Sequence, residues 1–172
     1  MYAYIQPHYF FAYFIFFSAL IVTIRSDIET MLILRHVTLF LAPCGFIFSA
    51  YGLLPLSLSA SIAGAIFGYL FLFTINTLFK YLRNKDGMGD GDFDLLLFIG
   101  SFTGIIGCWT SIMIGSIVGS LYGLCSIIFL SYRHKENNDP YNTKIPFGPF
   151  LALGAIIFIF LQRYFFLIFS LA

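Results

Sequence analysis

The sequence has very few charged residues for its length. Of its 172 residues only 10% are Asp, Glu, Lys or Arg, whereas 60% are hydrophobic and 20% are aromatic. A soluble domain has about a quarter charged residues, so this composition excludes a soluble globular enzyme. It also excludes a disordered chain, because disorder needs low hydrophobicity and a high net charge. The scarcity of charge therefore indicates a chain that folds within a membrane.

An excess of basic residues and paired cysteines are both missing. The formal net charge is +1, so there is no basic surface of the kind that binds nucleic acid. The three cysteines, Cys44, Cys108 and Cys125, stand singly in apolar stretches and form no CxxC pair. This arrangement predicts neither a disulfide framework nor a zinc site. We expect a protein without a metal ion or another cofactor.

Long apolar runs occupy most of the chain. A spanning helix takes about 20 mostly apolar residues, and the first run has no basic stretch before it, so we expect a retained helix and not a cleaved signal peptide. The sequence predicts an all-α, polytopic membrane protein with about six transmembrane helices, in a single transmembrane domain covering residues 1–172. The expected spans are residues 9–24, 31–53, 59–79, 95–109, 110–130 and 146–169.

Glycines at four-residue spacing mark two of these runs. Gly64 and Gly68 lie in the third run, and Gly115, Gly119 and Gly123 lie in the fifth. Small residues at this spacing share one helix face and allow close helix approach. We expect both faces to pack against neighbouring helices.

The basic residues are distributed unevenly between the two sides of the predicted membrane domain. Eight of the nine Lys and Arg lie in or beside the connections after the first, third and fifth runs, and the other connections contain none. By the positive-inside rule these three connections face the cytoplasm, and both termini lie on the extracytoplasmic side. The eight basic residues are Arg25, Arg35, Lys80, Arg83, Lys85, Arg133, Lys135 and Lys144.

Two pairs of acidic residues lie where water-exposed chain is scarce. Asp27 and Glu29 stand in a very short connection between two apolar runs, and Asp92 and Asp94 directly precede the apolar residues 95–99. Ionisable groups at membrane depth are costly and tend to mark function. Closely spaced glycines before Asp92, among them Gly89 and Gly91, permit a bend beside that carboxylate.

Carboxylates from these two segments, Asp27 and Asp92, are predicted on the same membrane face. Two carboxylates that meet cannot easily both be ionised, so one keeps its proton. The ionised group can take a proton from an attacking water, while the protonated group polarises a peptide carbonyl. The pair is therefore suited to aspartic-protease chemistry, which needs no metal.

Three stretches of the sequence resemble the motifs of the type IV prepilin peptidases, membrane aspartic proteases of type IV pilus and type II secretion systems. They are residues 27–32 (DIETML), 85–93 (KDGMGDGDF) and 145–152 (IPFGPFLA). The resemblance implies that Asp27 and Asp92 are the catalytic pair and that Gly89 and Gly91 shape the active-site loop. It also implies a prepilin or pseudopilin substrate, cleaved after its short basic leader at the cytoplasmic face of the inner membrane.

The sequence departs from the family pattern at several positions. Arg35 stands where the family usually has the acid of a Leu-Pro-Asp segment, Asp94 where a basic residue is common, and Asp90 where the residue is usually uncharged. The paired CxxC motifs of the cytoplasmic domain that many bacterial members carry are not found, so the sequence is similar to a short form of the family. We therefore predict proteolysis without predicting N-methylation, and Glu29, Asp90 and Asp94 as contacts for the basic leader.

Two other functions use the same residues. In a cation-coupled transporter or channel subunit the acids would bind or relay cations, and in a structural scaffold they would be loop charges beside glycine-rich packing faces. The acids lie at one membrane edge and no inverted repeat is apparent, which favours the peptidase over a transporter. Membrane lipid is an expected partner, and a homo-oligomer is left open.

Overall fold

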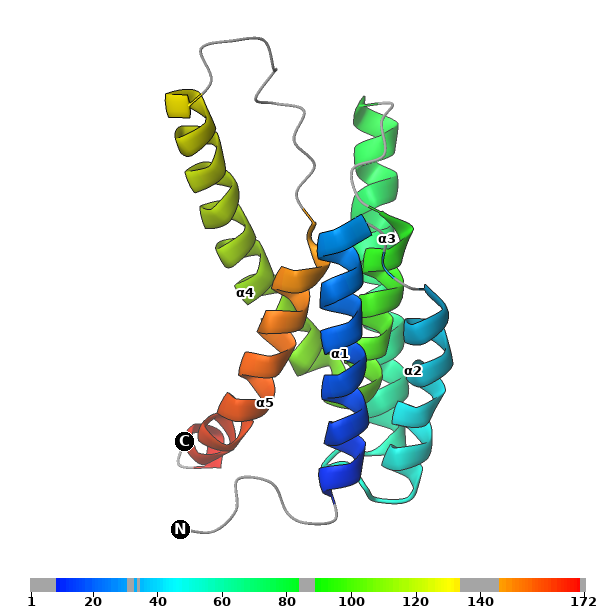
Figure 1. Cartoon of the computed structure of the whole chain (residues 1–172). Coiled ribbons are helices and arrows are strands. Elements are labelled where there is room, and N and C mark those ends of the chain that lie inside the picture. The colour runs from blue at the N-terminus through cyan, green and yellow to red at the C-terminus, as the bar shows by residue number, and fades with distance from the viewer. Residues whose placement is uncertain (1–8, 31–32, 34, 84–88, 134–145, 171–172) are drawn as a thin grey trace.

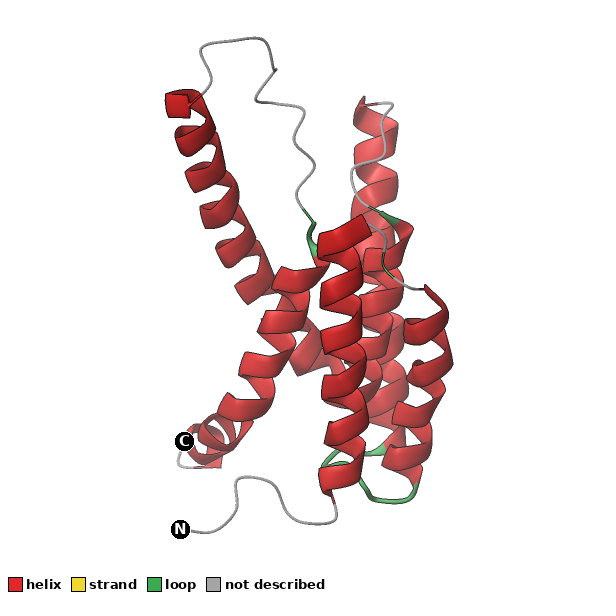
Figure 2. Ribbon diagram, in the orientation of Figure 1, coloured by secondary structure: helices red, strands yellow, loops and turns green. Residues whose placement is uncertain are grey.

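The computed structural model describes residues 9–30, 33, 35–83, 89–133 and 146–170. Five helices account for nearly all of them, and these residues contain no strand (Figure 2). The all-α prediction is confirmed. The basic residues Lys85, Lys135 and Lys144, on which part of the expected topology rests, lie outside the described residues. In chain order the helices are α1 (Phe10–Thr30), α2 (Arg35–Ala50), α3 (Leu58–Arg83), α4 (Asp90–Arg133) and α5 (Gly148–Ser170).

Helix α4 consists of two helical arms joined at Gly104. This residue has φ 71° and ψ −171°, a backbone conformation that glycine adopts without a Cβ clash. Beyond it, the Cys108 thiol lies 3.5 Å from the Leu96 carbonyl oxygen, whereas twelve residues of straight helix span about 18 Å. The chain therefore folds back, and the two arms form the V seen in Figure 1. They match the fourth and fifth expected runs, but the break lies at Gly104 and not between residues 109 and 110.

Close backbone contacts join α3 to the first arm of α4. A Cβ on Gly64 would lie 2.5 Å from the Gly100 carbonyl oxygen, and a Cβ on Gly68 would lie 2.6 Å from that of Leu96. On the second arm, a Cβ on Gly115 would lie 3.1 Å from the Phe150 carbonyl oxygen of α5. The prediction that both glycine faces pack against helices is confirmed at these positions, and at Gly64 and Gly68 only glycine allows the observed approach.

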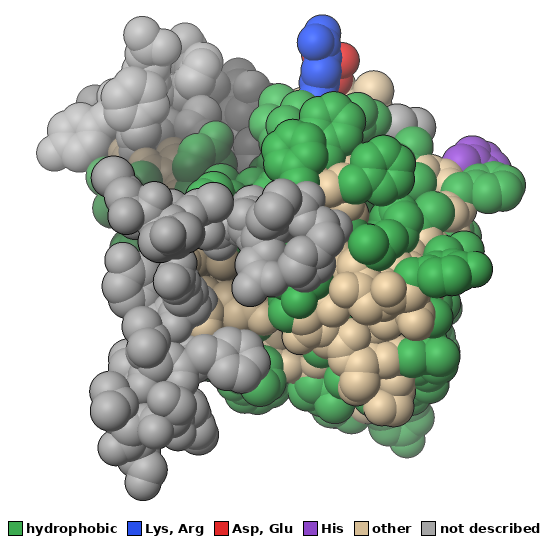
Figure 3. All heavy atoms as spheres, turned by 90° about the horizontal axis from the view of Figure 1, so that it is seen from below, with side chains coloured by type: hydrophobic (Ala, Val, Ile, Leu, Met, Phe, Trp, Pro, Cys, Tyr) green, Lys and Arg blue, Asp and Glu red, His purple; other side chains and the backbone are tan. Residues whose placement is uncertain are grey.

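The core is aromatic, and much of the surface is apolar. Phe16, Phe98 and Phe102 pack with ring centroids 5.0–5.3 Å apart. The described part of the face in Figure 3 shows hydrophobic and uncharged side chains, with charged groups only at its edge. Among the described residues, α1, α3 and residues 90–126 of α4 are long and apolar enough to cross a membrane. Such a surface suits lipid, as expected for a polytopic membrane protein.

Candidate active site

Asp27 and Asp92 lie at the same end of the helical bundle. Asp27 belongs to the last turn of α1 and Asp92 to the first turn of α4, and Figure 1 shows these two helix ends together with the start of α5. Both residues are buried, with exposed fractions of 5% and 7%. The two acids lie close enough to interact electrostatically. The structure thus brings the two predicted catalytic residues together.

The start of α5 holds the Asp27 carboxylate. The backbone N–H of Gly148, the first residue of α5, donates a hydrogen bond to Asp27 Oδ2 at 3.0 Å. The first N–H groups of a helix have no partner within the helix, which leaves this donor available. A Cβ on Gly148 would lie only 2.6 Å from Asp27 Oδ2. Glycine at this position is therefore what allows the carboxylate to reach the backbone.

Ile33 links this contact to the segment that carries Asp92. Its Cδ1 lies 3.1 Å from the position of a Cβ on Gly148, and its Cβ lies 2.6 Å from that of a Cβ on Gly91. Gly91 is thus closely covered by Ile33. The Asp92 N–H donates a hydrogen bond to the Gly89 carbonyl oxygen at 3.1 Å, which closes the turn that begins α4. Segments far apart in the sequence converge on this one apolar side chain.

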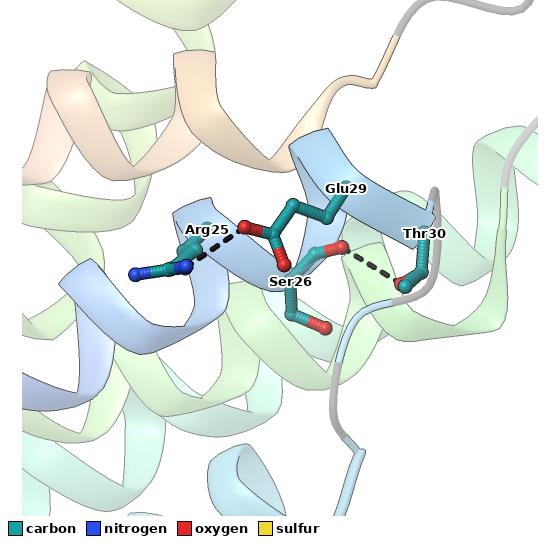
Figure 4. A network of polar contacts seen from close by, with 4 residues as sticks. All are labelled: Arg25, Ser26, Glu29 and Thr30. Atoms are coloured by element: carbon teal, nitrogen blue, oxygen red, sulfur yellow. Dashed lines mark hydrogen bonds and ion pairs between the residues drawn. The ribbon is translucent and has the colours of Figure 1, made fainter.

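The three acids predicted to contact a basic leader differ in their surroundings. Asp90 is exposed. Glu29 is also exposed, and its Oε1 accepts a hydrogen bond from Arg25 Nε at 2.9 Å (Figure 4). Asp94 is buried, and its Oδ2 accepts a hydrogen bond from Arg35 Nε at 2.6 Å. Only Asp90 and Glu29 therefore present their carboxylates at the surface of the described structure.

Gly148 and Ile33 were not predicted as site residues. Gly148 lies within the stretch IPFGPFLA that resembles a family motif, so the signal for it was present in the sequence. Ile33 carried none, because one apolar residue among many has no distinguishing pattern. The described residues contain no group of three or more His, Cys, Asp or Glu that could hold a metal ion. The absence of a cofactor stays a prediction.

The fold and the site together define an all-α protein of membrane-spanning character with a buried aspartate pair at one end of its bundle. Residues 14–124 match the family model of the type IV leader peptidases. The chain belongs to this family.

Curated relatives agree with this assignment. The chain is 40% identical over 113 residues to the prepilin leader peptidase/N-methyltransferase of Pseudomonas aeruginosa, a match that covers 66% of the chain and 36% of that protein. It is 34% identical over 151 residues to the protein of the same name from Burkholderia pseudomallei, covering 88% of the chain and 46% of the relative. The matches thus span less than half the length of these relatives. No solved structure matches the chain.

Proposed function

We propose that the chain is a transmembrane aspartic endopeptidase that removes the short basic leader of type IV prepilins or type II secretion pseudopilins. The observation that carries the proposal is the meeting of Asp27 and Asp92 as buried neighbours in a member of the leader peptidase family. Two adjacent carboxyl groups that share one proton provide both a general base and a general acid. The proposal covers proteolysis and does not extend to N-methylation.

The hydrogen bond from Gly148 suggests how the two roles are divided. Because Asp27 Oδ2 accepts this N–H, Asp27 is the better candidate for the ionised base, and its other oxygen would take the proton from water. Asp92 then carries the proton and donates it to the carbonyl oxygen of the scissile peptide bond. The water oxygen bonds to the carbonyl carbon as Asp27 takes the water proton, which gives a neutral gem-diol.

Collapse of the gem-diol completes the reaction. Asp27 passes its proton to the leaving nitrogen, the carbon–nitrogen bond breaks, and a gem-diol hydroxyl returns its proton to Asp92. The products are a carboxylic acid and an amine, and both aspartates regain their starting states. No step requires a metal ion.

The position of the pair suits a substrate that is itself a membrane helix. A scissile bond within a helix is protected by its hydrogen bonds and must unwind before cleavage, and a glycine near it lowers that cost by about 1 kcal/mol. Figure 1 shows the C-terminal ends of α3 and α4 extending past the end of α1 and the start of α4. We propose that the leader approaches the exposed Asp90 and Glu29 at this end of the bundle, from the cytoplasmic face of the inner membrane.

The test is removal of the leader from a co-expressed prepilin in cell membranes. We compare the wild-type chain with Asp27→Asn, Asp92→Asn and the control Asp139→Asn, whose residue the sequence places in a polar loop. Loss of a general acid or base typically costs about 10²–10⁴-fold in rate. We therefore expect the shortened product to disappear in the first two variants and to persist in the control, at equal membrane levels.

Two outcomes would contradict the proposal. Equal processing by all four chains would remove the aspartic mechanism. A wild-type chain that processes none of several pilin-like substrates would favour the transporter or scaffold function.

A further inference from the structure

A half-buried ion pair, between Arg35 and Asp94, lies two residues along the chain from Asp92 and has no part in the proton transfers. Arg35 Nε donates to Asp94 Oδ2 at 2.6 Å, and the Asp94 side chain is only 2% exposed whereas that of Arg35 is 54% exposed. An ionised carboxylate buried among apolar side chains is costly unless it is paired. Asp94 therefore depends on Arg35, which lies 59 residues earlier in the chain.

The pair joins the same two segments as the contact between Ile33 and Gly91. Arg35 is the first residue of α2, two residues after Ile33, and Asp94 lies two residues after Asp92. One contact therefore precedes Asp92 in the chain, and the other follows it. The segment that carries Ile33 and Arg35 therefore contacts the start of α4 at two points, one on each side of Asp92.

We propose that Arg35 and Asp94 are a positioning pair that fixes the first turn of α4 against the start of α2, so that the Asp92 carboxyl group faces Asp27. This inference rests on the proposed function. Neither residue takes part in proton transfer. Their contribution is orientation, and a misplacement of about 1 Å at a reacting group costs about 100-fold in rate.

A purely stabilising pair predicts a different result from a positioning pair. If the pair only stabilised the fold, its loss would lower the melting temperature, while the folded enzyme would keep its kcat. If the pair orients Asp92, the folded enzyme has a lower kcat with a nearly unchanged KM. Arg35→Lys, which keeps the positive charge beside Asp94, then retains most of the kcat.

The test uses the full chain in detergent with a purified prepilin. We expect Arg35→Gln and Asp94→Asn each to lower kcat about 10–100-fold with KM within about threefold, and Arg35→Lys to retain most of the activity. The matched control is Arg25→Gln, because Arg25 also donates through Nε to a carboxylate but is 79% exposed. Exposed pairs contribute little, so its kcat should change less than about twofold.

Hydrogen exchange of the peptide that covers residues 89–96 gives a readout independent of cleavage. The Asp92 N–H is hydrogen-bonded to Gly89, and we expect its exchange to accelerate about tenfold or more in Arg35→Gln but not in Arg25→Gln. A wild-type chain that cleaves nothing would refute the proposed function and leave this readout to decide on the pair. Unchanged exchange in Arg35→Gln, or an unchanged kcat in the folded variant, would overturn the positioning role.

Discussion

Gly148→Ala tests whether the start of α5 positions Asp27. The added Cβ would lie 2.6 Å from Asp27 Oδ2, whereas ordinary contact begins at 3.4 Å, so one of the two groups must move by about 0.8 Å. Ile33 Cδ1 lies 3.1 Å from the same Cβ position, so the new methyl group cannot move toward Ile33 to relieve the clash. A shift of 0.8 Å along the present hydrogen bond of 3.0 Å would lengthen it beyond 3.5 Å, which breaks it.

The expected effect is a fall in kcat of about 10–100-fold, because misplacing a reacting group by about 1 Å costs on this order. In free energy this is about 1.4–2.7 kcal/mol of lost transition-state stabilisation. The assay is steady-state cleavage of a purified prepilin, with kcat referred to the folded fraction of enzyme.

Gly154→Ala is the matched control for this variant. Its Cβ would lie 2.7 Å from Ser111 Cα and the Ser111 carbonyl oxygen, so it also forces a clash between α5 and its neighbour. This clash lies about 9 Å further along α5, away from Asp27. We expect a lower melting temperature with an unchanged kcat for the folded enzyme. Full kcat in Gly148→Ala, or an equal loss in both variants, would refute the positioning of Asp27 by Gly148.

Two further predictions concern packing and metal dependence. Gly64→Leu should prevent stable folding, because even a Cβ at this position would lie 2.5 Å from Gly104 Cα. In Gly119→Ala the new Cβ would lie 3.3 Å from a ring atom of Phe150, so this variant should have only a slightly lower melting temperature. Thermal unfolding in detergent distinguishes them, and equal stability would contradict the close α3–α4 contact. Chelation with EDTA should leave cleavage unchanged, since none of the proposed steps uses a metal. A loss that added metal restores would show that the mechanism is wrong.

The helical class and most helix positions followed from the sequence because membrane spans need long apolar runs, and such runs are visible without any tertiary information. The break within residues 95–130 was misplaced. Trp109 and Thr110 look like a boundary, yet the chain reverses at Gly104 (φ 71°). Several glycines in this region could adopt the positive φ that the reversal requires. Only the packing of the two arms against α3 and α5 selects one of them.

The site was only partly visible in the sequence for a related reason. The two aspartates stand out because acids are rare at membrane depth, but their partners are a backbone N–H and an isoleucine, which no sequence pattern marks. Arg35 and Asp94 each appeared as a separate departure from the family motifs. Their relation depends on a contact across 59 residues, and only the fold makes it apparent.

The placement of the pair at helix ends explains how two buried acids are tolerated there. Asp92 lies in the first turn of α4, and Asp27 accepts a hydrogen bond from the first residue of α5. The Asp27 carboxylate lies at the N-terminus of α5, where a carboxylate gains about 0.3–1 kcal/mol, and up to about 2 kcal/mol when partly buried. Acids within a continuous helix would find all nearby backbone N–H groups already bonded. The N-terminus of α5 therefore provides the donor that a buried carboxylate needs, which suits Asp27 to the role of the ionised base in the proposed mechanism.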